Sequence, residues 1–208
     1  MSGSSDLPAI DLRTIDPWLL AAGAVLLGVL VGVIGVFGWR AWRARRERRA
    51  RAALIASVSL DHARDVVVLD GNGGTLHLDY LLLTPRGLVV LEMRDAAGNV
   101  FGSDAMTEWT VMDGPRRYTF ANPQASLYDR IAAVKAQADD IPVEGRVVFT
   151  RRANFPKGLP RLTLREDSLG IELLMGDRDH AERAVEPWRG TWQRLRAELR
   201  PSGFSGVG

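Results

Sequence analysis

Two acidic residues and one arginine occupy positions where charged side chains are unusual. Asp79 lies inside an otherwise apolar run, and Glu92 lies near the end of the next apolar run, with Arg94 two residues beyond it. Carboxylates are rarely buried unless they are paired or bound to a metal. Two carboxylates on neighbouring strands would form the oxygen site that Mg²⁺ prefers, and such an ion can generate a hydroxide nucleophile. These residues therefore predict a magnesium site for phosphodiester chemistry.

The elements that would bring these residues together are two strands joined by a short turn. Residues 75–84 and 88–94 are apolar enough for a central hairpin, and Pro85-Arg86-Gly87 is typical of the turn between them. Asp79 and Glu92 would then converge at one end of the sheet. Arg94 shares the face of Glu92, and His77 that of Asp79, because side chains alternate along a strand. A single histidine on a strand is more often structural.

The rest of the soluble part predicts a mixed α/β domain over residues 53–199, with a central mixed β-sheet flanked by helices. Further strands are predicted at 65–70, 100–101, 109–112, 118–120, 146–150 and 171–175, with a loop over 151–168. Helices are predicted at 123–139, 178–184 and 187–199. A Gly- and Ser-containing flexible tail, 200–208, follows the domain.

Residues 17–39 carry no charge and predict one transmembrane helix. At about 1.5 Å per residue it would span roughly 34 Å, enough for a bilayer core of about 30 Å. Trp18 and Trp39 lie at its ends, where indoles prefer the headgroup region. A cleaved signal peptide would need a basic start and a shorter apolar run, of about 7–15 residues. The span therefore predicts a membrane anchor in contact with the lipid bilayer.

Charge is distributed unevenly around this span. Seven arginines against one glutamate give residues 40–51 a charge of +6, whereas residues 1–16 carry −2. The positive-inside rule then predicts a single-pass protein of a bacterial-type inner (plasma) membrane, with the tail 1–16 outside and the C-terminal domain in the cytoplasm. The arginine-rich helix, 40–52, would contact anionic lipid. Within the span, Ala24, Gly28 and Gly32 share one helix face and predict a homodimer contact.

Composition excludes some kinds of site. The chain of 208 residues has no cysteine, so it has no disulfide, thiolate metal site or cysteine nucleophile. The net charge is +2, and once the two N-terminal segments are subtracted the remaining residues, 52–208, carry −2. No domain-wide basic field therefore favours nucleic acid.

The run from Leu78 to Arg94 resembles the centre of the NERD (nuclease-related) domain, whose signature has an Asp on one strand and Glu-x-Lys on the next. The glycines, tryptophan and Asn-Pro element of that family follow here in the same order, as Gly98, Gly102, Trp109 and Asn122-Pro123-Gln124. The resemblance covers about residues 60–155. It implies a fold similar to that of PD-(D/E)XK nucleases, with a metal held by Asp79 and Glu92, and catalytic roles for these acids, Arg94 and Gln124.

The sequence departs from that family at important positions. Arg94 replaces the motif lysine, and a planar, permanently charged guanidinium is not equivalent to an amine at a tight catalytic site. The Gly-Glu pair of the first helix is missing, and an anchor next to the domain restricts access to DNA. The sequence therefore predicts a Mg²⁺-dependent nuclease with weakened or lost activity. The alternative is a non-catalytic, membrane-tethered module that binds nucleic acid or a protein partner.

Overall fold

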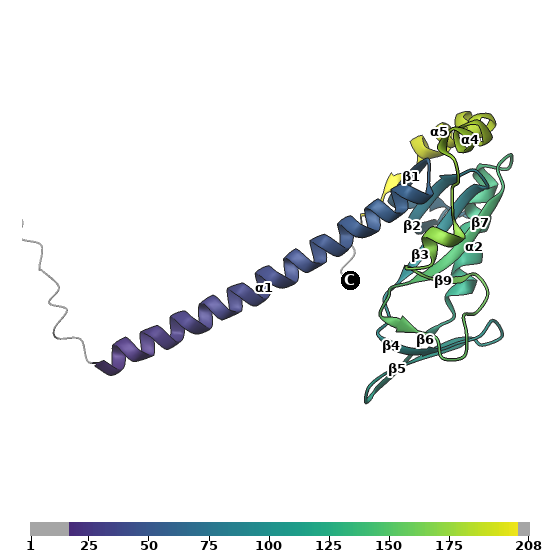
Figure 1. The fold of residues 1–208 in the computed structure, drawn as a ribbon. Coiled ribbons are helices and arrows are strands. Elements are labelled where there is room, and N and C mark those ends of the chain that lie inside the picture. Colours follow the sequence, from purple (N-terminus) through teal and green to yellow (C-terminus); the bar gives the residue numbers. More distant parts are fainter. Residues whose placement is uncertain (1–16, 204–208) are drawn as a thin grey trace, which may run out of the picture. The chain divides into compact units, whose positions relative to one another are not determined.

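The computed structural model describes residues 17–203, so the predicted tail 1–16 and residues 204–208 lie outside the described part. The chain divides into two compact units, Met1–Arg51 and Ala52–Gly208. Figure 1 labels the helices and strands of both units.

A single α-helix, α1 (Pro17–Val58), begins with the apolar run and continues through the arginine-rich segment, as predicted. Its residues from Ala21 onward have the length and composition needed to cross a membrane, with a mean hydropathy of 2.4 in the most apolar window. The predicted homodimer through Ala24, Gly28 and Gly32 stays a prediction: an added Cβ at either glycine meets no atom within 4 Å, and the side chain of Ala24 is outside the described part.

The second unit is built on a mixed sheet with the strand order β10-β1-β2-β3-β7-β9. The β2–β3 hairpin lies at its centre, as predicted, and β3, β7 and β9 run parallel to one another. The strands are β1 (Asp61–Leu69), β2 (Thr75–Thr84), β3 (Gly87–Arg94), β7 (Val143–Phe149), β9 (Thr163–Arg165) and β10 (Arg200–Pro201).

A smaller sheet, with the order β6-β5-β4-β8, completes the strands of this unit. Figure 1 shows β4, β5 and β6 beyond one end of the larger sheet and α4 and α5 beside the other end. The strands are β4 (Gly98–Phe101), β5 (Glu108–Asp113), β6 (Arg116–Ala121) and β8 (Ala153–Asn154).

Helices cover both faces of the larger sheet, which gives the expected α/β class. One face packs Leu81, Leu83 and Val90 against α2 (Pro123–Gln137), α4 (Arg178–Val185) and α5 (Arg189–Glu198). The other face packs Tyr80, Leu82 and Leu91 against the last turns of α1 and against α3 (Leu169–Glu172). A 3₁₀ turn, η2 (Glu186–Trp188), joins α4 to α5.

Buried apolar side chains hold the helices against the two faces of the sheet. Ile55 and Val58 of α1 are almost fully buried, as are Leu127 of α2 and Trp192 of α5. Trp192 and Leu195 pack against the sheet, as the helical spacing predicts. The core therefore includes the end of α1, which starts in the other unit.

Three expectations about local structure were wrong. Residues 171–175 are not a strand, because α3 buries Leu169 and Leu173 at helical spacing and leaves Ile171 exposed. The segment 151–168 contains β8 and β9 and is not a continuous loop. The predicted tail at 200–208 begins with β10, in which Pro201 pairs with Val66 of β1.

Candidate functional site

The β2–β3 hairpin sets the two predicted acids level with each other. Tyr80 lies opposite Leu91 in the register, so Asp79 and Glu92 occupy the next positions along the two strands. The turn at Pro85–Gly87 fixes this register, because Thr84 pairs with Gly87. Asp79 therefore lies in β2 and Glu92 in β3, on the two strands that the sequence predicts.

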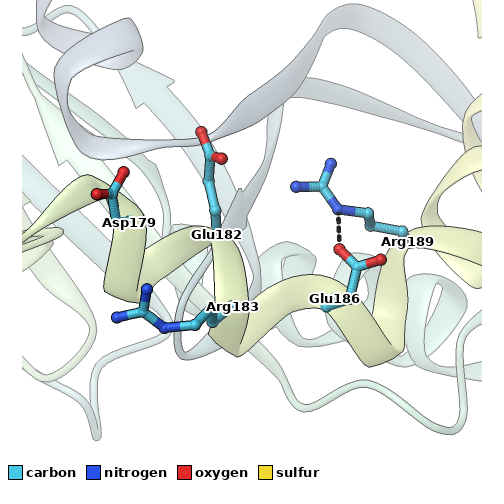
Figure 2. Close-up of a pocket in the computed structure, with 5 residues that line it drawn as sticks. All are labelled: Asp179, Glu182, Arg183, Glu186 and Arg189. Atoms are coloured by element: carbon cyan, nitrogen blue, oxygen red, sulfur yellow. Dashed lines mark hydrogen bonds and ion pairs between the residues drawn. The ribbon is translucent and has the colours of Figure 1, made fainter.

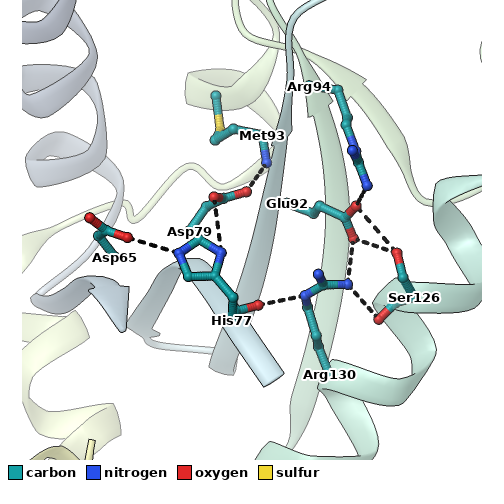
Figure 3. A network of polar contacts seen from close by, with 8 residues as sticks. All are labelled: Asp65, His77, Asp79, Glu92, Met93, Arg94, Ser126 and Arg130. Atoms are coloured by element: carbon teal, nitrogen blue, oxygen red, sulfur yellow. Dashed lines mark hydrogen bonds and ion pairs between the residues drawn. The ribbon is translucent and has the colours of Figure 1, made fainter. Parts of the chain in front are cut away.

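Glu92 is almost completely buried, with 3% of its surface exposed. Arg94 Nη2 donates to Oε1 of Glu92, and Arg130 Nη1 donates to Oε2 over 3.2 Å. Ser126 Oγ also contacts this carboxylate, at 3.1 Å from Oε2. Figure 3 shows the carboxylate enclosed by these three side chains, two of them from α2. Its negative charge is therefore already compensated within the protein.

The two arginines around Glu92 differ in how freely they could bind anything else. Arg130 is 18% exposed, and it donates to the backbone oxygens of His77 over 2.6 Å and Ser126 over 2.8 Å. Arg94 is 43% exposed. Among the described residues, Arg94 Nε is the one buried side-chain nitrogen without a hydrogen-bond partner. Arg130 is therefore a fixed support, whereas part of the Arg94 side chain is open to solvent.

Asp79 has a separate set of partners. Its Oδ2 accepts a hydrogen bond from the backbone N–H of Met93 over 2.7 Å, and His77 Nδ1 lies 3.7 Å from its Oδ1. His77 Nε2 is 2.8 Å from Asp65 Oδ1. Figure 3 shows the Asp79 carboxylate beside the His77 ring and the backbone nitrogen of Met93, while the Glu92 carboxylate points toward α2. Among the described residues, no side chain or backbone group contacts both carboxylates.

A distortion of β1 and β2 accounts for this divergence. Arg64 pairs with Tyr80 and Val66 pairs with Leu78, but the two residues between them, Asp65 and Asp79, do not pair. Asp65 has a φ of 53°, which a non-glycine residue rarely adopts. Leu78 and Leu81, three residues apart, both belong to the core on the α2 face, so strict alternation fails between them. Alternation alone could not predict where Asp79 points.

These contacts provide a test of whether the acids fit a magnesium ion. A shared ion needs oxygen atoms that converge on one point. Here the carboxylates diverge, and Glu92 is held by two guanidinium groups. The described residues also contain no group of three or more His, Asp or Glu side chains arranged for a metal. The arrangement as it stands does not fit Mg²⁺, so metal binding by Asp79 and Glu92 stays a prediction.

Gln124 lies at the start of α2, where Asn122 caps the helix by accepting from the backbone N–H of Gln124 over 2.9 Å. Gln124 is 5% exposed. Its amide donates to Asp104 Oδ1 over 2.8 Å and to the backbone oxygen of Arg161. The Asn-Pro-Gln element therefore ties α2 to two loops. A role for Gln124 toward nucleic acid stays a prediction, and it would require these bonds to be released.

The model of the nuclease-related domain family, NERD, matches residues 42–150, just over half of the chain. The chain belongs to the NERD family. No curated protein matches the chain, and no solved structure does.

The NERD match extends from the arginine-rich part of α1 to the end of β7 and includes the hairpin and α2. It is consistent with the expected likeness to PD-(D/E)XK nucleases. Sequence reasoning missed Ser126 and Arg130, which bring α2 to the NERD acid Glu92. Their spacing of four residues puts both on one helix face, and a buried acid needs cations; together these signals could have indicated them.

The two surface hollows lie away from Asp79 and Glu92. One of about 550 Å³ is lined by Asp179, Glu182, Arg183, Glu186 and Arg189. Figure 2 shows these three acids and two arginines along α4, η2 and the start of α5, where Glu186 pairs with Arg189 at 2.6 Å. A second hollow of about 450 Å³ lies along β5 and β6. None of the predicted site residues lines either hollow.

Proposed function

We propose that this protein is a membrane-anchored NERD protein that binds the phosphate backbone of nucleic acid beside Glu92 without hydrolysing it at an appreciable rate. The observation that carries the proposal is the buried Glu92 carboxylate held between Arg94 and Arg130. Family membership supports a nuclease-related role, and the pairing of Glu92 with two arginines favours binding of phosphate over its hydrolysis.

The charge of the cluster favours an anion. The Glu92 carboxylate is shared by two guanidinium groups, which leaves an excess of one positive charge on the side of the network away from the carboxylates of Asp65 and Asp79. Arg94 is the more exposed of the two arginines, at 43% against 18% for Arg130. A guanidinium group binds phosphate through two parallel hydrogen bonds. Arg94 is therefore the residue that would contact a phosphodiester.

The same contacts argue against efficient hydrolysis. Glu92 would have to leave both arginines before it could serve another ligand, and removing a partner from a buried ion pair costs about 3–5 kcal/mol. Asp79 is engaged with the N–H of Met93 and faces another direction. A guanidinium group carries donors and no acceptor, so Arg94 could not take a proton from an attacking water.

A second candidate is the Mg²⁺-dependent nuclease, in which Asp79 and Glu92 hold the ion, Arg94 stabilises charge on the phosphate and Gln124 positions the nucleic acid or the attacking water. It is favoured by one observation: the register sets the two acids level on adjacent strands. Such an ion would supply a hydroxide nucleophile. This candidate requires both carboxylates to turn toward each other.

Membrane anchoring is supported by the surface of α1. Its large apolar side chains between Val25 and Trp42 are exposed; Leu26, for example, is 70% exposed and Phe37 69%. Exposed apolar surface of this extent is unfavourable in water and favourable in a bilayer. The arginines that follow, and the acidic residues that precede the helix, support an orientation with the NERD domain in the cytoplasm.

The test uses the full chain purified in a non-ionic detergent, with fluorescein-labelled single- and double-stranded DNA and RNA. We expect binding in EDTA as well as in Mg²⁺ or Mn²⁺, and no cleavage above the level of Asp79→Ala. Arg94→Gln should weaken binding about tenfold, because a charged hydrogen-bonded contact is lost. The matched control is Arg178→Gln, an exposed arginine of α4 paired with Glu182, which should bind as the wild type does.

Two results would contradict the proposal. One is the absence of nucleic-acid binding by the wild type at low salt. The other is metal-dependent cleavage that disappears in Asp79→Ala, which would establish the second candidate. Thermal unfolding gives an independent reading, since a bound ion raises the melting temperature by mass action. We expect no rise with Mg²⁺ or Mn²⁺; a rise that is lost in Glu92→Gln would instead support the metal site.

A further inference from the structure

The part of α1 that follows the apolar run carries an unusual concentration of arginine. Side chains from Arg40 to Ala50 are exposed, and that of Arg51 is partly buried. The one acid, Glu47, pairs with Arg43 at 3.0 Å. The arginines, which we call the arginine collar, are Arg40, Arg43, Arg45, Arg46, Arg48, Arg49 and Arg51.

The collar surrounds the helix on all sides. Successive residues of an α-helix are rotated by about 100° around its axis. Viewed down the axis, the seven arginines are therefore spread around the full circle, and no gap between neighbouring directions exceeds about 60°. A helix that lies in the plane of a membrane surface needs an apolar face opposite a basic one. No such face is left between Arg40 and Arg51. This segment is therefore suited to being surrounded by anionic groups and not to lying on a membrane surface.

Two tryptophans mark the level at which the collar begins. Trp39 and Trp42 are 58% and 57% exposed. The guanidinium carbon of Arg43 lies 5.8 Å from the Trp39 ring centroid, and that of Arg46 lies 5.6 Å from the Trp42 centroid. Indoles prefer the headgroup region of a bilayer, and cation–π contact holds each guanidinium group beside its ring. The first arginines are thus held at the depth of the lipid phosphates.

We propose that the arginine collar is a binding site for anionic phospholipids, whose phosphate groups its first arginines contact on several sides of α1. The proposal rests on the membrane anchoring proposed above. Guanidinium groups bind phosphate oxygens in pairs, which suits a site built from arginine without lysine. Duplex nucleic acid is the competing partner, but the adjoining indoles and apolar run favour lipid.

The contribution of each arginine decreases with its distance from the membrane. Arg40 and Arg45 lie about 1.5 and 9 Å along the axis from Trp39, whereas Arg48 and Arg49 lie about 14 and 15 Å away. Electrostatic attraction to a membrane surface decays over a Debye length of about 8 Å at physiological salt. The first pair should therefore account for most of the lipid preference, although both pairs carry the same charge.

The experiment uses the full chain in neutral detergent micelles. Native mass spectrometry measures bound phosphatidylglycerol relative to phosphatidylcholine with the same acyl chains. The ratio of bound phosphatidylglycerol to bound phosphatidylcholine should fall about sevenfold in the double variant Arg40→Gln/Arg45→Gln. In the matched variant Arg48→Gln/Arg49→Gln it should fall about twofold. Glutamine is a good helix former, so neither variant should disrupt α1.

Vesicle sedimentation tests the membrane anchor separately from lipid binding by the collar. A chain that sediments with vesicles of phosphatidylcholine alone is anchored, whatever the collar does; a chain that stays in solution with them is not. The collar proposal is overturned if the wild type shows no preference for phosphatidylglycerol, or if the two double variants lose equal preference. Displacement of phosphatidylglycerol by duplex DNA at equal phosphate concentration would also overturn it.

Discussion

Asp61, the first residue of β1, connects the start of the sheet to the last helix. Its Oδ2 accepts from Trp192 Nε1 over 2.9 Å and from Arg196, and its Oδ1 accepts from the N–H of His62 over 2.8 Å. Partial burial acts to raise the pKa of Asp61, but the hydrogen bonds from Trp192, His62 and Arg196 outweigh it and hold the pKa below its ordinary value of 3.8. The folded state therefore favours the ionised form.

This pKa predicts how stability depends on pH. Because the pKa is lower in the folded chain, the stabilisation from Asp61 is fully present above about pH 4, near its unfolded value, and is lost as the pH falls through the folded value. The free energy of urea unfolding should therefore differ most between the wild type and Asp61→Asn at pH 6, and the difference should narrow toward pH 2. A difference that stays constant from pH 6 to pH 2 would contradict this assignment.

At the scale of single residues, the sequence identified the unusual acids but not their partners. Asp79 and Glu92 could be singled out because each interrupts an apolar run. The direction of Asp79 could not be predicted, since it depends on a distortion that includes the positive φ of Asp65 on another strand. Arg130 was missed for a similar reason: its contacts with Glu92 and His77 span 38 and 53 residues of sequence.

Among the elements, those with a strong local pattern were predicted most closely. The expected strand 75–84 matches β2, and the expected helix 123–139 ends two residues later than α2. Short apolar runs were less informative, because four or five apolar residues fit a buried helix turn as well as a strand. That ambiguity explains the error at α3. The two-residue strands β8 and β10 depend on partners distant in sequence and leave almost no local signal.

The turn that joins β2 to β3 should be sensitive to a single methyl group. Gly87 has a φ of +122°, and an added Cβ would lie 2.2 Å from the backbone oxygen of Pro142. We expect Gly87→Ala to reduce the free energy of unfolding by about 3 kcal/mol or more, from backbone strain and steric overlap together. Chemical denaturation of the full chain in detergent measures this loss.

Gly71 provides the matched control for that measurement. Its φ is +79°, but an added Cβ would meet no atom within 4 Å. Gly71→Ala should therefore cost only the conformational strain, about 1 kcal/mol. Equal losses in the two variants would show that the close approach of Gly87 to Pro142 has no energetic importance.

For the whole molecule, the proposed topology can be tested because the chain has no cysteine. Single cysteines are introduced as Ser4→Cys, before the apolar helix, and as Lys157→Cys, at an exposed position of the second unit. In intact bacterial cells a membrane-impermeant maleimide should label the first variant and not the second. After permeabilisation it should label both. Labelling of Lys157→Cys in intact cells would reverse the proposed orientation.

The last turns of α1 belong to the hydrophobic core of the NERD domain, since Ile55 is fully buried and Val58 is 2% exposed. A protease that cuts among the arginines would release a domain with its core intact. A cut between Val58 and β1 would instead remove two core side chains, each worth about 1.5–3 kcal/mol of burial. By the same reasoning, exchange of this anchor for another by recombination would preserve a folded domain only if the junction lay before Leu54.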